Sequence, residues 1–228
     1  MPVASKNSTR RKKVLSADVS GVILAGGKSS RYGANKAFVE VDGIPLIERV
    51  AGVLQSIFEQ TVIVTNSPEE YSYLNMPMRR DIIPGLGPLG GILTGLQMIP
   101  GKAGFFVACD MPFLSPDLIR YMVGIKDQFD VVVPKITWKI EALHALYGTK
   151  CIPFIEKLIQ SGNYQIVRLF QYVSVGYVGE DEIVQFDPEL RSFFNINRPE
   201  EIRNMAETGE FSHEKERRYR KGKKVQIK

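Results

Sequence analysis

The chain has 228 residues, 44% of them apolar and 24% charged, which predicts one globular α/β domain with a real hydrophobic core. No apolar stretch is long enough for a membrane span, and no signal-peptide core follows the basic N-terminal residues, so we expect a soluble cytoplasmic protein without membrane partners. Much of the net charge of +5 lies in residues 10–13 and 215–228. These segments do not interleave aromatic residues with their charges, so we interpret them as solvated tails rather than nucleic-acid-binding surfaces.

Cysteine and histidine usage argues against a structural zinc site. Cys109 and Cys151 are far apart in the sequence and form no CxxC pair, and the only histidines, His144 and His213, show no metal-ligand spacing. Two unpaired cysteines are also what a reducing compartment would allow.

From Val19 onward, short β-branched runs alternate with longer amphipathic stretches. This pattern is typical of strand-helix-strand units that build a largely parallel sheet, and it predicts a Rossmann-like three-layer α/β sandwich. The expected strands of the first part are 21–25, 61–66, 104–110 and 131–136. A first helix is expected after Pro45, where apolar residues recur at helical spacing. A second should start just after Pro88, and a third at Ser115, which can cap it.

The pattern after Lys135 is less regular. It predicts a strand at 144–148, a helix at 153–162 that Gly162 ends, a strand at 173–178 and a short strand at 193–197. No internal repeat or low-complexity linker interrupts residues 19–205, so a second folding unit is not expected.

The densest chemical pattern is LAGGKSSRYGANK, residues 24–36, which directly follows the first strand. Glycines at the carboxyl end of a parallel strand let the backbone approach a ligand, and their N–H groups can cradle phosphate oxygens. Arg31 and Lys36 add positive charge suited to a triphosphate that becomes pyrophosphate. The spacing is neither GxxxxGK[ST] nor GxGxxG, which disfavours a P-loop ATPase or a dinucleotide oxidoreductase.

Asp110 ends the apolar run of residues 104–109 and is followed by Met-Pro, which places its carboxylate at the carboxyl edge of the sheet. Mg²⁺ needs only one or two protein oxygens when substrate phosphates supply the rest, so one aspartate suffices. Taken alone, Asp110 could equally be a turn residue. Beside the glycine loop, we favour a metal ligand.

The pattern L-A-G-G-x-S-x-R-x-G-x-x-K resembles the signature of the molybdenum cofactor guanylyltransferases. The resemblance continues through residues 81–91, 109–114 and 194–201, and it covers about 19–205. Gly27 is the finer discriminator, because related cytidylyltransferases resemble L-A-A-G at this place.

The resemblance implies a nucleotidyltransferase (GT-A-like) fold with a mostly parallel central sheet, and an enzyme that transfers GMP from GTP to the phosphate of molybdopterin with Mg²⁺. GTP and molybdopterin or the molybdenum cofactor are the implied partners, together with proteins of cofactor biosynthesis or molybdoenzyme maturation. We expect one domain at 18–207, with a nucleotide-binding half at 18–125 and an acceptor half at 126–207. Residues 1–17 and 208–228 would be basic tails, the first of them disordered.

The family's functional residues carry over by position. The implied nucleotide contacts are Leu24, Ala25, Gly26, Gly27, Lys36, Asn66, Asp81 and Asp110. Lys36, Asp110 and Arg31 are the residues expected in catalysis, and Asp110 and Asn197 are the expected metal contacts. Asp81 is a plausible reader of guanine, whose pairing edge presents two adjacent donors to an acceptor oxygen.

Several alternatives stay open at this point. The chain could be a CTP-dependent cytidylyltransferase for a pterin or polyol phosphate, or a nucleotide-binding protein without catalysis. Asn197 could cap a helix instead of binding metal. His144 is interpreted as structural or pocket-lining, in a segment where Ala142 replaces the family's proline. Arg168 could equally contact an acceptor phosphate or form a surface salt bridge.

Overall fold

A mixed sheet forms the centre of the protein. The computed structural model describes residues 18–26, 35–137 and 139–196, and within them eight strands form one sheet in the order β10-β7-β9-β6-β1-β4-β5, with β8 paired to β7. Neighbouring strands are parallel except that β9 runs against β6 and β7, and β8 against β7. The strands are β1 Val19–Leu24, β4 Thr61–Val64, β5 Met78–Arg79, β6 Ala103–Ala108, β7 Val131–Ile136, β8 Lys139–Ile140, β9 His144–Gly148 and β10 Val175–Gly179.

Helices and short turns connect these strands. The α-helices are α1 Leu46–Ile57, α2 Gly87–Met98, α3 Pro116–Gly124, α4 Ile152–Gln160, α5 Ile166–Leu169 and α6 Glu180–Ile183. The 3-10 helices are η1 Lys36–Phe38, η2 Pro68–Leu74, η3 Lys126–Gln128, η4 Thr149–Cys151 and η5 Arg191–Phe193, and β2 Glu40–Val41 pairs with β3 Ile44–Pro45.

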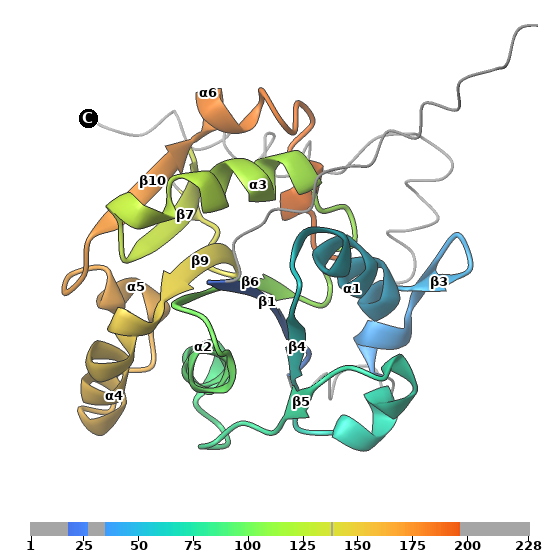
Figure 1. Ribbon diagram of the computed structural model, residues 1–228, viewed down its shortest axis with the longest axis horizontal. Helices are drawn as coiled ribbons and strands as arrows, with labels where there is room; N and C mark the ends of the chain where they lie inside the picture. The colour runs from blue at the N-terminus through green and yellow to red at the C-terminus, as the bar shows by residue number, and fades with distance from the viewer. Residues whose placement is uncertain (1–17, 27–34, 138, 197–228) are drawn as a thin grey trace, which may run out of the picture.

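The sheet lies between two layers of helices (Figure 1). One core contains apolar residues of α1 and α3, and the other contains apolar residues of α2, α4 and α5. Strand β1 is buried along its whole length and contributes to both, with Ile23 in the first core and Val22 in the second, because successive side chains of a strand point to opposite faces. The predicted three-layer sandwich with a mostly parallel central sheet is confirmed.

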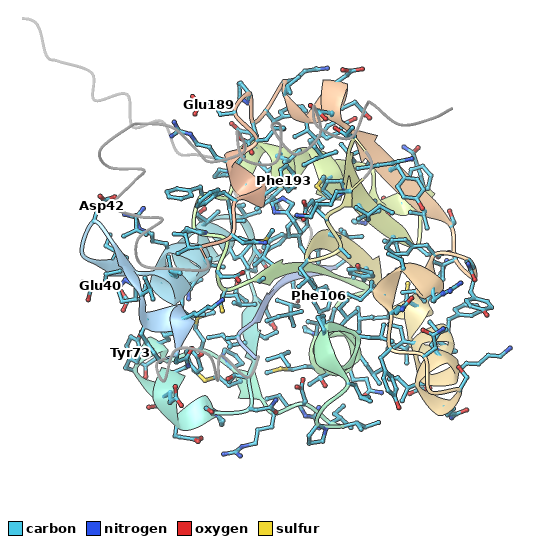
Figure 2. The ribbon with its side chains drawn as sticks, turned by 180° about the vertical axis from the view of Figure 1, so that it is seen from behind. Glu40, Asp42, Tyr73, Phe106, Glu189 and Phe193 are labelled. Atoms are coloured by element: carbon cyan, nitrogen blue, oxygen red, sulfur yellow. The ribbon has the colours of Figure 1, made fainter. Side chains whose placement is uncertain are left out.

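Close approach of α2 to the sheet depends on a glycine. A Cβ atom built on Gly95 would lie 2.6 Å from the Phe106 ring and 2.8 Å from Val22. Phe106 itself is fully buried in the interior (Figure 2). A larger residue at position 95 would push α2 away from the sheet.

The predicted helices are present with small shifts in their bounds. Ser115 caps α3 as expected, since its side chain accepts a hydrogen bond from the Leu118 N–H at 3.3 Å. Helix α4 ends at Gln160, two residues before Gly162, which adopts a positive φ of 74°. In the part of the chain that the structure describes, no helix is both long and apolar enough to cross a membrane.

Three predicted strands overran their observed ends in the same way. The sequence pattern extended them to residues 25, 66 and 110, whereas the sheet ends at Leu24, Val64 and Ala108. In each case the next residue makes one more backbone hydrogen bond, from Ala25 to Val64, Thr65 to Arg79 and Cys109 to Leu24. The chain then leaves the sheet, and the residues that leave it include predicted site residues.

The predicted strand at 193–197 is wrong for its described residues. Phe193 ends η5, and residues 194–196 form no regular element. The Asp187 carboxylate accepts the N–H groups of Arg191 and Ser192 at 3.0 and 2.8 Å, which curls the chain into a 3-10 turn instead of an extended edge.

This C-terminal segment is nevertheless tied to the loop after β6. The Ile196 N–H donates to the Asp110 carbonyl at 2.9 Å, and the Ser115 N–H donates to Ser192 Oγ at 2.8 Å. The Ser115 hydroxyl donates in turn to the Phe186 carbonyl at 3.0 Å. Residues 186–196 therefore support residues 110–115.

Candidate active site

The carboxyl ends of β1, β4 and β6 meet at one edge of the sheet. In the pairing register, Leu24 lies opposite both Val64 and Ala108, so the segments that follow these residues start side by side. In open α/β sheets this edge is where ligands bind. The structure thus brings together the predicted Leu24–Gly26, Asn66 and Asp110 segments, which are up to 86 residues apart in sequence.

Asn66 and Asp81 form a reciprocal pair. Asn66 Nδ2 donates to Asp81 Oδ2 at 2.9 Å, and the Asp81 backbone N–H donates to Asn66 Oδ1 at 3.2 Å. A Cβ atom on Gly26 would lie 4.0 Å from Asn66 Nδ2, so the end of the β1 segment lies beside this pair. The two predicted nucleotide contacts, which lie on different loops, hold each other in place.

Asp81 retains one oxygen for a further donor. Its Oδ1 atom is buried and accepts no hydrogen bond from the described residues. Leaving a buried carboxylate oxygen unsatisfied is costly, so a ligand donor would be favoured there. Gly91 of α2 lies beside this oxygen without a side chain, whereas a Cβ atom at that position would be in van der Waals contact with Asp81 Oδ1, at 3.8 Å.

The loop that carries Asp81 is fixed from α2. The Ile82 N–H donates to the hydroxyl of Thr94, a fully buried residue of α2, at 3.1 Å. Gly85 and Gly87 adopt positive φ angles of 88° and 61°, so the turn into α2 uses backbone conformations that glycine permits most readily. Two glycines of the segment 81–91, part of the family resemblance, thus have a structural role in this turn.

Lys36 lies close enough to Asp110 to influence its pKa. Asp110 is half-buried, and burial raises the pKa of its carboxyl group, while the nearby Lys36 ammonium and a backbone hydrogen bond lower it. Burial likewise raises the pKa of the adjacent Cys109 thiol to about 12, and Lys36 again opposes the shift. A cation and a carboxylate at the same strand edge can contact a phosphate chain and its counter-ion.

Three of the predicted site residues, Gly27, Arg31 and Asn197, lie outside the described residues. Their roles stay predictions. Across residues 18–26, 35–137 and 139–196, no three His, Cys, Asp or Glu side chains gather as a metal-binding group. Asp110 is thus the expected metal ligand that the described residues contain, and Asn197 lies outside them.

His144 is a core residue. Its side chain is fully buried, with its ring edge-on to Phe105 and Phe193 at centroid distances of 5.2 and 5.0 Å (Phe193 is labelled in Figure 2). Burial lowers the pKa of the imidazole to about 3, so the ring is neutral at physiological pH. Of the two interpretations from sequence, the structure supports the structural one.

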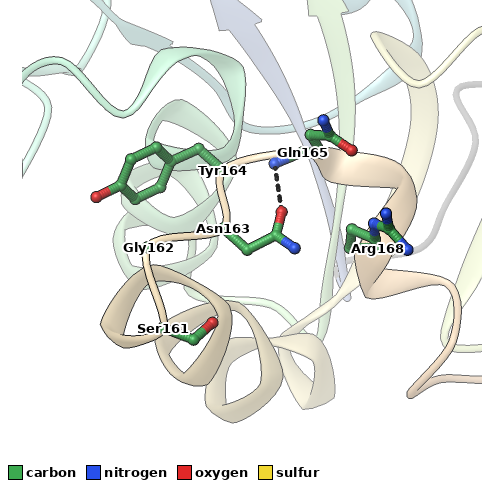
Figure 3. A pocket seen from close by; sticks show the side chains of 6 residues that line it. All are labelled: Ser161, Gly162, Asn163, Tyr164, Gln165 and Arg168. Atoms are coloured by element: carbon green, nitrogen blue, oxygen red, sulfur yellow. Dashed lines mark hydrogen bonds between the residues drawn. The ribbon is translucent and has the colours of Figure 1, made fainter.

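A polar hollow of about 510 Å³ lies between α4 and α5. Its lining residues are Ser161, Gly162, Asn163, Tyr164, Gln165 and Arg168 (Figure 3). Asn163 Oδ1 accepts the Gln165 N–H at 3.2 Å, which shapes the rim. Arg168 forms no salt bridge with any residue the structure describes, so the salt-bridge alternative has no support there.

The hollow lies on the helices that follow β9. β9 runs against β6, so it ends at the edge opposite Asp110, and α4 begins there. α4 packs against α2, where Gln97 donates to Glu156 at 3.3 Å, and the chain reverses at 161–165 before Tyr172 stacks on Phe154 near the start of α4.

Sequence reasoning missed three supporting residues: Asn35, Tyr71 and Thr94. Asn35 caps η1, since its Oδ1 accepts the Ala37 N–H at 3.1 Å. An asparagine directly before a short helix is a recognisable cap, so this role had a signal in the sequence. Tyr71 and Thr94 had none, because their contacts join segments far apart in sequence.

A sheet-edge site of backbone turns, a lysine and a carboxylate, on a three-layer α/β fold, defines a nucleotidyltransferase. Comparison with known families agrees with this class. The model of the MobA-like NTP transferase domain matches residues 21–175, more than half of the chain. The chain belongs to this family.

Individual relatives support the same assignment. A probable molybdenum cofactor guanylyltransferase of Peptoclostridium acidaminophilum is 38% identical over 82% of this chain and 88% of its own. A molybdenum cofactor guanylyltransferase of Desulfosudis oleivorans is 38% identical over 81% and 92%. The crystal structure of molybdopterin-guanine dinucleotide biosynthesis protein A from Archaeoglobus fulgidus aligns with a TM-score of 0.70 at 29% identity, over 81% of this chain and 95% of that one. The resemblance seen in the sequence is confirmed.

Proposed function

We propose that this nucleotidyltransferase transfers GMP from GTP to the phosphate of molybdopterin, forming the guanine dinucleotide cofactor and releasing pyrophosphate. The observation that carries the choice of base is the buried, unsatisfied Oδ1 of Asp81 beside Gly26 and Asn66. Guanine presents an amino donor that could satisfy this acceptor, and its ring N–H lies next to it. The names of the relatives support both the guanylyl group and the molybdenum cofactor as the substrate class.

The residues at the strand edge suit a bound Mg²⁺. Asp110 supplies a half-buried carboxylate oxygen, and oxygen ligands are the ones Mg²⁺ takes in proteins. Asn197 is the second expected contact, beyond the described residues. When bound there, the ion would neutralise charge on the α- and β-phosphates.

The protein's own groups position the reaction. An oxygen of the acceptor phosphate attacks the α-phosphorus of GTP in line, a new P–O bond forms, and the bond from the α-phosphorus to the bridging oxygen breaks, leaving pyrophosphate. The Lys36 ammonium would stabilise the phosphate chain, and Arg31 is expected to do the same. The acceptor is already an anion, so no strong base is required, which is compatible with a buried neutral His144.

The acceptor would approach from the half of the molecule that contains the α4–α5 hollow. Arg168 and the amides of Asn163 and Gln165 are among the donors that line it, and an arginine can bind a phosphate or another anionic group of the acceptor. We also propose that the protein works in the cytoplasm, with partners from cofactor biosynthesis or molybdoenzyme maturation.

The test is binding of GTP, CTP and ATP in parallel, with and without Mg²⁺, followed by pyrophosphate release on addition of molybdopterin. We expect Mg²⁺-dependent preference for GTP and pyrophosphate release only when the acceptor is present. Tighter binding of CTP would instead indicate a cytidylyltransferase. Binding of GTP without turnover of any pterin phosphate would instead indicate a nucleotide-binding protein without catalytic activity.

A further inference from the structure

The residue before Lys36 is held by side chains from a distant segment. Asn35 Nδ2 donates to the Tyr71 hydroxyl and to Glu70 Oε2, both at 2.7 Å, while its Oδ1 caps η1. Glu70 and Tyr71 belong to η2, 35 and 36 residues along the chain. The backbone that presents Lys36 is therefore fixed from outside its own loop.

Tyr71 is itself well anchored. Its side chain is 1% exposed, and its ring stacks on Phe38 of η1 with centroids 5.2 Å apart. Thr65, a buried residue directly after β4, lies near the phenol and helps to lower its pKa. Burial raises the pKa of the phenol to about 12, so it stays protonated.

The phenol oxygen thus lies near two residues that each precede a proposed nucleotide contact. Asn35 directly precedes Lys36, and Thr65 directly precedes Asn66. Neither Asn35 nor Tyr71 is among the residues proposed to touch substrate. The hydrogen bond from Asn35 to the buried Tyr71 hydroxyl restricts how far η1 can move relative to η2.

The geometry points to Tyr71 and Asn35 as positioning residues that fix Lys36 to η2, the segment that follows β4, so that its ammonium stays near Asp110 when the nucleotide binds. This inference rests on the proposed role of Lys36 in binding the triphosphate. The expected gain comes from preorganisation, because a lysine held near its bound position loses less freedom on binding.

Tyr71→Phe tests the inference with little disturbance, since it keeps the buried ring and its stack on Phe38 and removes only the hydroxyl. We expect the Kd for Mg·GTP to rise about three- to tenfold, the range of one neutral hydrogen bond. Tyr73→Phe is the matched control. Tyr73, labelled in Figure 2, lies two residues further along η2 and is 49% exposed, and Glu48 rather than Asn35 lies near its hydroxyl. We expect it to leave the Kd unchanged.

A double-mutant cycle separates positioning from general stability. If Tyr71 acts through Lys36, then Tyr71→Phe should have no further effect on the Kd in a Lys36→Ala background. If Lys36→Ala binds GTP too weakly to measure, a second cycle that combines Tyr71→Phe with Asn35→Ala can replace the first. The effects of these two substitutions on the Kd should also be non-additive. Urea unfolding of each variant reports any loss of stability separately.

The outcomes distinguish this inference from the proposed function. Additive effects in both cycles, or equal weakening by Tyr71→Phe and Tyr73→Phe, would overturn the positioning role. Unchanged GTP binding in Tyr71→Phe, with weakened binding in Lys36→Ala, would overturn it as well and leave the function intact. Failure of the wild-type protein to bind Mg·GTP would overturn the proposed function itself.

Discussion

The two halves of the sheet are built differently. In the half formed by β1, β4 and β6, the strands are parallel and their carboxyl ends place Gly26, Asn66 and Asp110 at one edge. In the other half, β9 runs against both neighbours and begins with a buried histidine, and the polar hollow lies on helices α4 and α5. Parallel strands gather backbone turns and charges in one place, which suits a triphosphate. The mixed half offers amides and an arginine, which suits a separate partner.

This comparison predicts its largest effect at Asp110. Asp110→Asn keeps the shape of the side chain and removes its charge, so we expect kcat to fall at least about a hundredfold, or roughly 2.7 kcal/mol of transition-state stabilisation. GTP binding should largely persist, because metal stabilisation matters most as pyrophosphate leaves. Pyrophosphate release measures turnover, with nucleotide binding followed on the same variant. Turnover near the wild-type rate in limiting Mg²⁺ would place the metal elsewhere.

Lys36→Ala should weaken GTP binding by roughly 1.5–3 kcal/mol, the range of one charge-assisted hydrogen bond. Lys135→Ala is the matched control in the other half, where the ammonium lies 5.6 Å from the Tyr177 ring centroid. Titration calorimetry should show a change in Kd for the first variant only. Equal changes in Kd for the two variants would mean that GTP affinity depends on the overall positive charge of the protein and not on a specific contact with Lys36.

His144 makes a prediction about acid stability. Its folded pKa of about 3 lies below the ordinary value of 6.5, so the unfolded chain binds a proton first as the pH falls. The stability contributed by the neutral ring is complete above pH 6.5 and is lost as the pH falls toward 3. At pH 5 the loss from this group is about 2 kcal/mol. Urea unfolding at pH 7 and pH 5 should show a smaller difference in His144→Leu, and an unchanged difference would contradict the buried neutral state.

Asp81→Asn should reduce GTP affinity about tenfold, or roughly 1.4 kcal/mol, because the buried Oδ1 position loses charge or acquires an amide donor. ATP lacks guanine's pairing-edge donors, so its weaker binding should change little. Competition between the two nucleotides on one sample gives the ratio directly. A parallel loss for both would indicate that Asp81 supports the loop without reading the base.

Arg168→Ala should have the smallest effect and act only on the other half. We expect the KM for the acceptor to rise severalfold, about 1 kcal/mol, with the Kd for GTP unchanged. Arg120→Ala provides a control, since Arg120 is paired with Asp117 on α3 at 2.8 Å. A change in GTP affinity without a change in the KM for the acceptor would contradict the assignment of the acceptor to the half that contains Arg168.

Apolar periodicity and motif spacing in the sequence predict much of the fold and several site residues. Buried β-branched runs identified β1, β4, β6 and β7, because a strand covered on both faces is apolar throughout. Lys36 and Asp110 were found because each follows directly on such a run or its glycine loop. Strand ends were less certain, since residues 25, 65 and 109 still form one sheet-like hydrogen bond before leaving.

Contacts between loops could not be found in this way. Asn66 and Asp81 were named by resemblance, yet their reciprocal hydrogen bonds depend on how two loops meet. The phenol of Tyr71 lies in a seven-residue 3-10 helix that is too short to show a period. The error at 193–197 has a similar cause, because the Asp187 carboxylate that curls this segment precedes it and has no part in its apolar pattern.

The hydrogen bonds between residues 110–115 and 186–196 have a consequence for the order of events during synthesis. Domains fold as the chain emerges from its N-terminus, and β1, β4 and β6 are available early. The loop that carries Asp110 gains its supports from Phe186, Ser192 and Ile196 only some eighty residues later. The candidate site can therefore be complete only after residue 196 has been synthesised, although Asp110 itself emerges near the middle of the chain.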